Sequence, residues 1–200
     1  EVGNMYINLG GIMFGQNNLI AARNYLDSAS ENYSKASYKN GLLLCKSNSA
    51  AVSNEVGEYD PAITYAREGV MLAKEIQDKY NQSLNYYHLG TAYRNKGIPA
   101  LYNTYMDSSM VKAREIKSRN MISEILNSQY EFANARGEYQ RALDFRNQYF
   151  AVKDSMFQER KSKDIVEMET QYKTREKDQE IAFLNQVFVV RVNTFVSQEH

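Results

Sequence analysis

Apolar side chains recur at three- and four-residue spacing along most of the chain, which predicts a series of amphipathic helices. The clearest example carries Tyr86, Leu89 and Tyr93 on one helical stripe. Gly90, beside that stripe, is small enough to let a second helix approach closely. Gly97 follows as the end of the helix, because glycine readily takes the left-handed conformation found just after a helix C-terminus.

The same pattern returns every forty residues. Steps of forty residues from Gly97 reach residue types that also tolerate the left-handed conformation, namely Asn17, Gly57 and Gly137. Five residues after each turn comes the position where the two helices of a hairpin would touch: Ala22, Ala62, Tyr102 and Ala142. Eight residues after each turn comes an aromatic side chain that would fill the adjacent core: Tyr25, Tyr65, Tyr105 and Phe145. Since Tyr102 is bulky, we expect a wider hairpin in the third repeat.

The motif aromatic-x2-Leu-Gly-x2-Tyr resembles the first helix of a tetratricopeptide repeat, whose usual length is about 34 residues. We interpret the longer period as roughly one and a half added helical turns per repeat. The resemblance implies an all-α fold, a superhelical array of about four antiparallel helix hairpins over residues 1–154. The first hairpin already contains Tyr6, Leu9 and Gly10 at the motif positions. We therefore expect the chain to be a processed product or a fragment, with repeats or a signal peptide upstream.

A charged segment follows the repeats. Fifteen of the 28 residues from 153 to 180 are charged, which predicts a solvated helix over residues 155–186, about 45 Å long. Its first part would cap the array and its second part would project. Ile165, Met168 and Tyr172 form a narrow apolar face, but Arg175 interrupts it and breaks a coiled-coil seam. Residues 187–192 are rich in β-branched side chains and could form a strand, and they are too few for a membrane span of about 20 residues. The structure of the tail as a whole, residues 187–200, is left open.

Composition and charge restrict the classes of function that the sequence is compatible with. The 24 basic and 24 acidic residues balance, which argues against a nucleic-acid surface and leaves open a membrane segment outside this chain. Cys45 is the only cysteine, so an internal disulfide and a multi-cysteine metal site are excluded, and its apolar neighbours favour an inert buried thiol. His88 lies in a packed helix, where a structural role is favoured over a catalytic one. No catalytic motif is present. We expect no enzyme activity, no cofactor and no metal.

A binding surface is expected on the first helix of each repeat, which lines the concave side of such an array. The stripe opposite the packing residues contains Tyr87, Thr91, Arg94 and Asn95 in the third repeat, Asn54 in the second, and Asn127, Glu131 and Asn134 in the fourth. Asparagine amides can pair with both groups of a peptide backbone, and arginine can hold a carboxylate. A protein or peptide partner is one interpretation of this stripe. A merely solvated curved face is the other.

The segment from Asp154 through Glu167 to Gln186 is similar to the juncture in membrane-anchored tetratricopeptide-repeat regulators of Gram-negative gut bacteria. That resemblance implies the sensory domain of a signalling protein on the extracytoplasmic side of the inner membrane. The chain departs from that family after Gln186, where no span follows and Arg191 interrupts the apolar run. Two alternatives remain: a cytoplasmic adaptor or peptide-sensing regulator of the same fold, and a structural module that forms a homodimer through residues 155–186.

Overall fold

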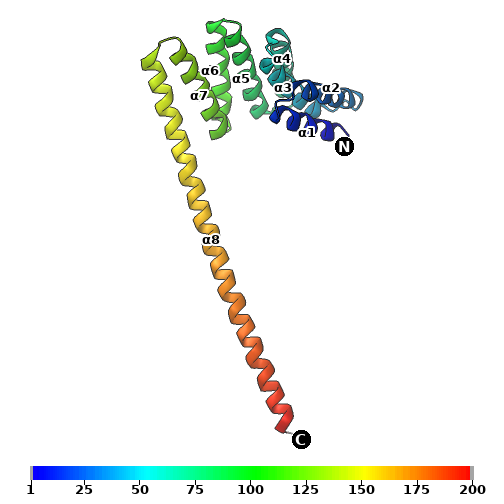
Figure 1. Ribbon diagram of the computed structural model, residues 1–200, viewed down its shortest axis with the longest axis vertical. Coiled ribbons are helices and arrows are strands. Elements are labelled where there is room, and N and C mark those ends of the chain that lie inside the picture. The colour runs from blue at the N-terminus through cyan, green and yellow to red at the C-terminus, as the bar shows by residue number, and fades with distance from the viewer. Residues whose placement is uncertain (1, 199–200) are drawn as a thin grey trace. The chain divides into compact units, whose positions relative to one another are not determined.

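The computed structural model describes the backbone of residues 2–198 and the side chains of residues 2–187. Within these residues every regular element is a helix and none is a strand (Figure 1). The helices are α1 (Val2–Gly15), α2 (Leu19–Lys35), α3 (Lys39–Glu55), α4 (Tyr59–Glu75), α5 (Lys79–Asn95), α6 (Pro99–Glu115), α7 (Arg119–Ala135) and α8 (Tyr139–Gln198). The all-α prediction is confirmed.

Every link between two helices contains a left-handed residue, whereas the sequence predicted one only in the turn within each hairpin. Each link contains a residue with positive φ, between 51° and 81°, and these residues are Asn17, Ser37, Gly57, Gln77, Gly97, Lys117 and Gly137. In each link the residue after the left-handed one donates its N–H back across the turn, as Ile98 does to the carbonyl of Tyr93 at 2.9 Å. The four turns expected within hairpins are therefore confirmed, and the turns between hairpins share their geometry.

The two helices of a hairpin meet at the positions that the sequence indicated. Ala22, Ala62 and Ala142 are 0, 0 and 3 % exposed. At Gly90 the approach is close, since a Cβ built there would lie 2.7 Å from the Cε atom of Met106 in α6. The predicted role of Gly90 as the point of close contact is confirmed.

The expectation of a wider third hairpin is wrong. The contact between α5 and α6 is more extensive than the contact within the first hairpin or within the second. The ring of Tyr102 does not hold the two helices apart, because it packs against α7. Its ring centroid lies 4.2 Å from that of Phe132, and its hydroxyl lies 3.2 Å from Oγ of Ser128. The bulky side chain therefore occupies the space between the third and fourth hairpins.

The array has an inner and an outer side. The first helices of successive hairpins, α1, α3, α5 and α7, contact one another in turn, whereas α2, α4 and α6 do not. In a curved stack the elements on the inner side lie closest together, so the first helices line the inner side and the second helices the outer. Figure 1 shows α5, α6 and α7 stacked in this order. This arrangement is a tetratricopeptide-like α-solenoid.

The chain divides into two compact units, residues 1–152 and 153–200. Helix α8 starts in the first unit, where Phe145, Tyr149 and Val152 pack on a buried cluster that includes Met121 and Ile125 of α7. The sequence led us to expect a separate helix that begins near residue 155 and a strand-like tail. The expected start of the helix is wrong, because one helix runs from Tyr139 to Gln198, and the tail, whose structure the sequence left open, is helical as far as Gln198. No glycine or proline follows Gly137, so no residue in this stretch ends the helix.

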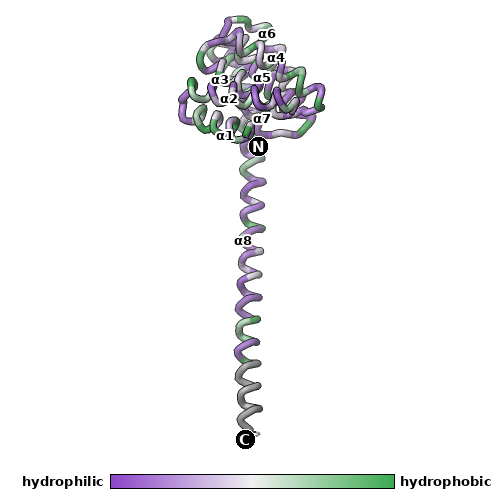
Figure 2. Tube along the Cα trace, turned by 90° about the vertical axis from the view of Figure 1, so that its right-hand side faces the viewer, coloured by the Kyte–Doolittle hydropathy of each residue, from purple (hydrophilic) through white to green (hydrophobic). Residues whose placement is uncertain are grey.

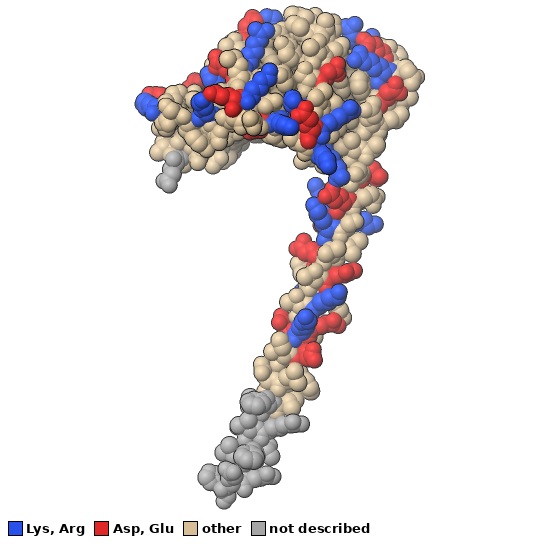
Figure 3. Space-filling view, turned by 180° about the vertical axis from the view of Figure 1, so that it is seen from behind, with Lys and Arg blue, Asp and Glu red and all other residues tan. Residues whose placement is uncertain are grey.

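In the second unit the described part of α8 is exposed to solvent on all sides. Every residue from 157 to 186 is exposed. Figure 2 shows mostly hydrophilic residues along this stretch, and Figure 3 shows basic and acidic side chains intermixed on it. The apolar face of Ile165, Met168 and Tyr172 is 43, 61 and 65 % exposed. No helix in the described part of the chain is long and apolar enough to cross a membrane. A role of this helix as a cap stays a prediction.

Candidate partner-binding surface

A polar cluster joins α5 and α7 on the inner side of the array. Nη1 of Arg94 lies 3.9 Å from Oε2 of Glu131, and Nδ2 of Asn127 donates to Oε1 of the same carboxylate at 2.8 Å. Nε of Arg94 also faces Oδ1 of Asn95 at 3.4 Å. Asn95 and Asn134 are exposed in the last turns of α5 and α7. The structure thus brings together three of the predicted residues, with two exposed amides on the same helices.

The predicted aromatic platform is less accessible than the sequence suggested. Tyr87 packs against the buried cluster formed by α6 and α7, and desolvation raises the pKa of its phenol. Thr91 donates its hydroxyl to the carbonyl of Tyr87 at 3.1 Å and is half-buried. Our assignment of Tyr87 to a free face outside the packing stripe is therefore wrong. The side chain belongs in large part to the contact between the third and fourth hairpins.

Asn54 lies inside the contact between α3 and α5. It is only 8 % exposed, and its Nδ2 donates to the carbonyl of His88 at 3.1 Å. Its Oδ1 is buried and has no hydrogen-bond partner in the part of the chain that is described. Asn54, Arg94 and Asn134 are equivalent positions, forty residues apart. The side chains of Asn54 and Arg94 each reach the first helix of the next hairpin. The forty-residue period places them at the same position of the repeat, but our sequence analysis did not predict this shared contact.

Burial shifts the pKa of two groups that the sequence analysis discussed, His88 and Cys45. Burial lowers the pKa of the His88 imidazole to about 4, so the ring is neutral at neutral pH. Burial raises the pKa of the Cys45 thiol to about 11, so the predicted inert thiol has little thiolate character. Among the described residues no group of three or more histidine, cysteine or acidic side chains could hold a metal ion.

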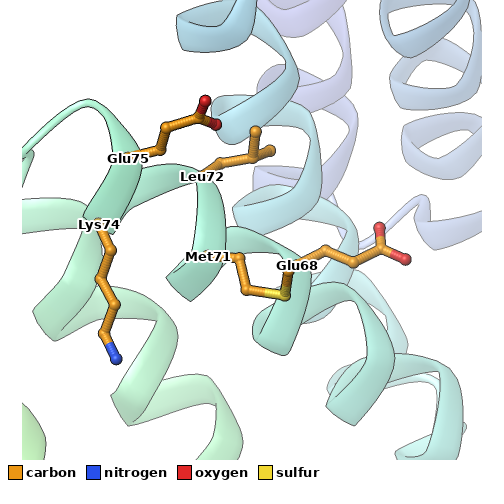
Figure 4. Close-up of a pocket in the computed structure, with 5 residues that line it drawn as sticks. All are labelled: Glu68, Met71, Leu72, Lys74 and Glu75. Carbon is orange, nitrogen blue, oxygen red and sulfur yellow. The ribbon is translucent and has the colours of Figure 1, made fainter.

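A shallow hollow lies on the outer side, on α4. Figure 4 shows its lining residues, Glu68, Met71, Leu72, Lys74 and Glu75, all from this one helix. The two glutamates are held by lysines of α3, Glu68 by Lys46 at 2.6 Å and Glu75 by Lys39. Ligand sites in proteins are concave and enclosed by several elements. Because the hollow has only one wall, we do not assign a ligand to it.

Comparison with known proteins agrees with the architecture. No protein-family model matches the chain, and no curated protein matches it. Aspartyl phosphate phosphatase F from Bacillus subtilis has a similar crystal structure, with a TM-score of 0.71 and 14 % identity over 77 % of this chain and 40 % of that one. A Rap protein in complex with Competence and Sporulation Factor gives a TM-score of 0.70 and 14 % identity over 75 % and 42 %.

At this level of identity the similarity establishes the fold. The chain has a tetratricopeptide-like helical repeat and spans about two fifths of the length of these two proteins.

Proposed function

We propose that residues 1–152 form a protein- or peptide-binding module, with the binding surface on the inner side of α5 and α7. The observation that carries this proposal is the Arg94–Glu131–Asn127 cluster, which joins two neighbouring first helices. Sites on packed helices are held more precisely than sites on loops. The similarity to a helical-repeat protein that was crystallised with a factor bound supports the proposal.

The cluster favours a partner segment with an acidic group. The guanidinium of Arg94 is 3.9 Å from its carboxylate, longer than a direct hydrogen bond, so an incoming carboxylate could form a closer pair. The exposed amides of Asn95 and Asn134 could pair with the backbone of an extended segment on either side. The partner-binding residues we propose are therefore Arg94, Asn95, Asn127, Glu131 and Asn134.

The finer proposal is a sensory role. We propose that this module is the input domain of a bacterial signalling regulator, placed on the extracytoplasmic side of the inner membrane by a segment outside this chain. The resemblance of the stretch from residue 154 to 186 to the juncture in membrane-anchored regulators supports this proposal. The long exposed helix of the second unit suits a connector between an input domain and another part of such a protein.

The test is capture of partners from the native extract with wild type, Arg94→Ala and Arg114→Ala side by side. Arg114 is an exposed arginine of α6 on the outer side, so its replacement removes the same charge from a different surface. We expect Arg94→Ala to lose one or more partners at least tenfold while Arg114→Ala keeps them, with equal thermal melts for all three. Equal recovery of every partner from all three proteins would contradict the proposed surface.

A further inference from the structure

Three tyrosine rings form a stacked tier where α4, α5 and α6 meet. The ring of Tyr105 in α6 lies between two rings of α5, with its centroid 5.4 Å from that of Tyr93 and 6.3 Å from that of Tyr86. The rings of Tyr93 and Tyr105 are nearly parallel, with 5° between their planes. Tyr93 is buried, whereas Tyr86 and Tyr105 are half-buried, so the stack reaches from the core to the surface. We name these three residues the tyrosine tier.

Helix α4 places a cation at each end of the tyrosine tier. Nη2 of Arg67 donates to the hydroxyl of Tyr93 at 2.8 Å, and Nζ of Lys74 lies 6.0 Å from the ring centroid of Tyr86. Because Tyr93 is only 7 % exposed, its hydroxyl holds the guanidinium in one place. Arg67 itself is exposed, and a guanidinium has five N–H donors, so it can bind a further acceptor.

Neither cation has a carboxylate partner of its own. Arg67 and Lys74 form no ion pair within the part of the chain that the structure describes. The two glutamates that follow them directly in sequence are bound to lysines of α3 instead. Arginine and tyrosine side chains are the usual energetic centres of protein interfaces. An unpaired guanidinium beside fixed aromatic rings is therefore typical of a surface that binds a partner.

This arrangement occurs at one joint of the array. Forty-residue steps from Arg67 reach no other cation, since the residues there are Asp27, Asp107 and Asn147. Forty-residue steps from Tyr93 reach no other aromatic residue, since the residues there are Met13, Ser53 and Ala133. Helices α4, α5 and α6 have further helices of the array on both sides, so this surface lies within the array and not at one of its ends.

We propose that this surface binds an acidic helix of a partner protein, through two carboxylates that lie two helical turns apart. Arg67 and Lys74 are seven residues apart on α4, so they share a face and lie about 10 Å apart along the helix axis. One small anion cannot reach both cations. Aspartate or glutamate side chains at positions i and i+7 of a helix have the matching spacing.

Each part of the surface has a role in this contact. The carboxylate opposite Arg67 accepts charge-assisted hydrogen bonds from the guanidinium, and the carboxylate opposite Lys74 forms an ion pair with the ammonium group. The half-buried rings of Tyr86 and Tyr105 supply apolar surface that the partner helix covers. This contact is independent of the inner-side surface proposed above, since Arg67 and Lys74 belong to a second helix.

The spacing favours a helical partner over an extended one. Side chains on one face of a strand are two or four residues apart, which places them about 7 or about 13 Å apart. Neither distance matches the separation of Arg67 and Lys74, whereas two turns of a helix do.

The test compares two synthetic peptides of about 20 residues, a length at which alanine-rich helices form in water. Both have the same composition, with two glutamates in an alanine and glutamine background, placed at i and i+7 in one peptide and at i and i+5 in the other. Side chains at i and i+5 point about 140° apart, so only the first peptide can reach both cations. By fluorescence anisotropy we expect wild type to bind the first peptide at least threefold more tightly, with the difference reduced by salt.

Three variants locate the contact. Arg67→Gln and Lys74→Gln should each abolish the preference for the i, i+7 peptide while their thermal melts stay equal to that of wild type. Arg114→Gln is the matched control, because Arg114 is the equivalent of Lys74 in α6 and its replacement removes the same charge from a surface without the tyrosine tier. This variant should keep the preference.

Several results would overturn the proposal. Wild type that binds neither peptide, or binds both equally, excludes a contact with paired carboxylates. An unchanged preference in Arg67→Gln places the contact on another surface. Full competition by sodium sulfate, under conditions where sodium chloride of equal ionic strength does not compete, would assign the surface to a small free oxoanion.

Discussion

The side chain of Asn85 in α5 lies directly against Gly69 in α4, so closely that a Cβ atom at Gly69 would overlap its amide. The amide cannot move aside easily, because Nδ2 of Asn85 donates to Oγ of Ser47 at 2.7 Å and to the carbonyl of Asn81 at 2.8 Å. Asn85 is fully buried. This contact therefore ties α3, α4 and α5 together at one point inside the array.

We predict that Gly69→Ala lowers the free energy of unfolding by roughly 1–3 kcal/mol, because the added methyl group overpacks a side chain held by two hydrogen bonds. Gly90→Ala is the matched control. Its methyl group would meet only the flexible end of Met106, and alanine is the better helix former by about 1 kcal/mol. Urea unfolding of both variants measures the difference. A Gly90 variant as destabilised as the Gly69 variant would contradict this prediction.

We predict that His88 makes stability depend on pH between about 4 and 6.5. The folded-state pKa is about 4 and the reference value is 6.5, so in this window the unfolded chain binds the proton that the folded chain does not. The free energy of unfolding then falls as pH is lowered from 6.5 toward 4, by roughly 3 kcal/mol in total.

The measurement for His88 is urea unfolding of wild type and His88→Gln from pH 4 to pH 8. The variant lacks the titrating group, so the difference between the two curves should change across the window and stay constant above pH 7. Parallel curves over the whole range would show that the imidazole titrates normally in the folded chain.

We predict that the Cys45 thiol is nearly unreactive in the folded protein. It is 1 % exposed, so a reagent can hardly reach it. Burial raises its pKa to about 11, so only a small fraction of the thiol is ionised to thiolate at pH 8. Labelling with a chromogenic disulfide reagent should be at least a hundredfold slower in buffer than in 6 M guanidinium chloride. Since Cys45 is the only cysteine, the signal has one source. Fast labelling in buffer would refute the buried position of the thiol.

We predict that a chain ending at residue 158 melts within about 2 °C of the full chain. The side chains of α8 that cover the last buried cluster, Phe145, Tyr149 and Val152, remain in it. A chain ending at residue 138 loses them, exposes Ile125 and should melt at least about 10 °C lower. Calorimetry of the three chains is the measurement. A melting temperature of the chain ending at residue 158 that lies far below that of the full chain would mean that the exposed helix stabilises the array.

The repeat architecture could be predicted because it depends on a strict period. The turn residues Asn17, Gly57, Gly97 and Gly137 carry a conformational preference that can be recognised in the sequence. The remaining left-handed positions are Ser37, Gln77 and Lys117, which have no such preference and adopt the conformation because packed helices on both sides require it. Tertiary packing decided these three turns, so local sequence could not indicate them.

The candidate site was only partly predictable for a related reason. A helical stripe shows which side chains share a face, but it does not show which neighbouring helix covers that face. Tyr87 and Asn54 share the stripe of Arg94 and are covered by α7 and α5. The direction of Tyr102 has the same origin, since χ angles and not sequence spacing turn its ring toward α7.

The return of a left-handed residue at every twentieth position limits how this protein can change in length over evolution. A duplication or loss of forty residues joins one link to its equivalent, so the helices that meet already carry matching faces. An insertion or deletion of one residue within a helix rotates the rest of that helix by about 100° and turns apolar side chains toward water. The array can therefore grow or shrink by whole hairpins while the contacts between its helices are kept.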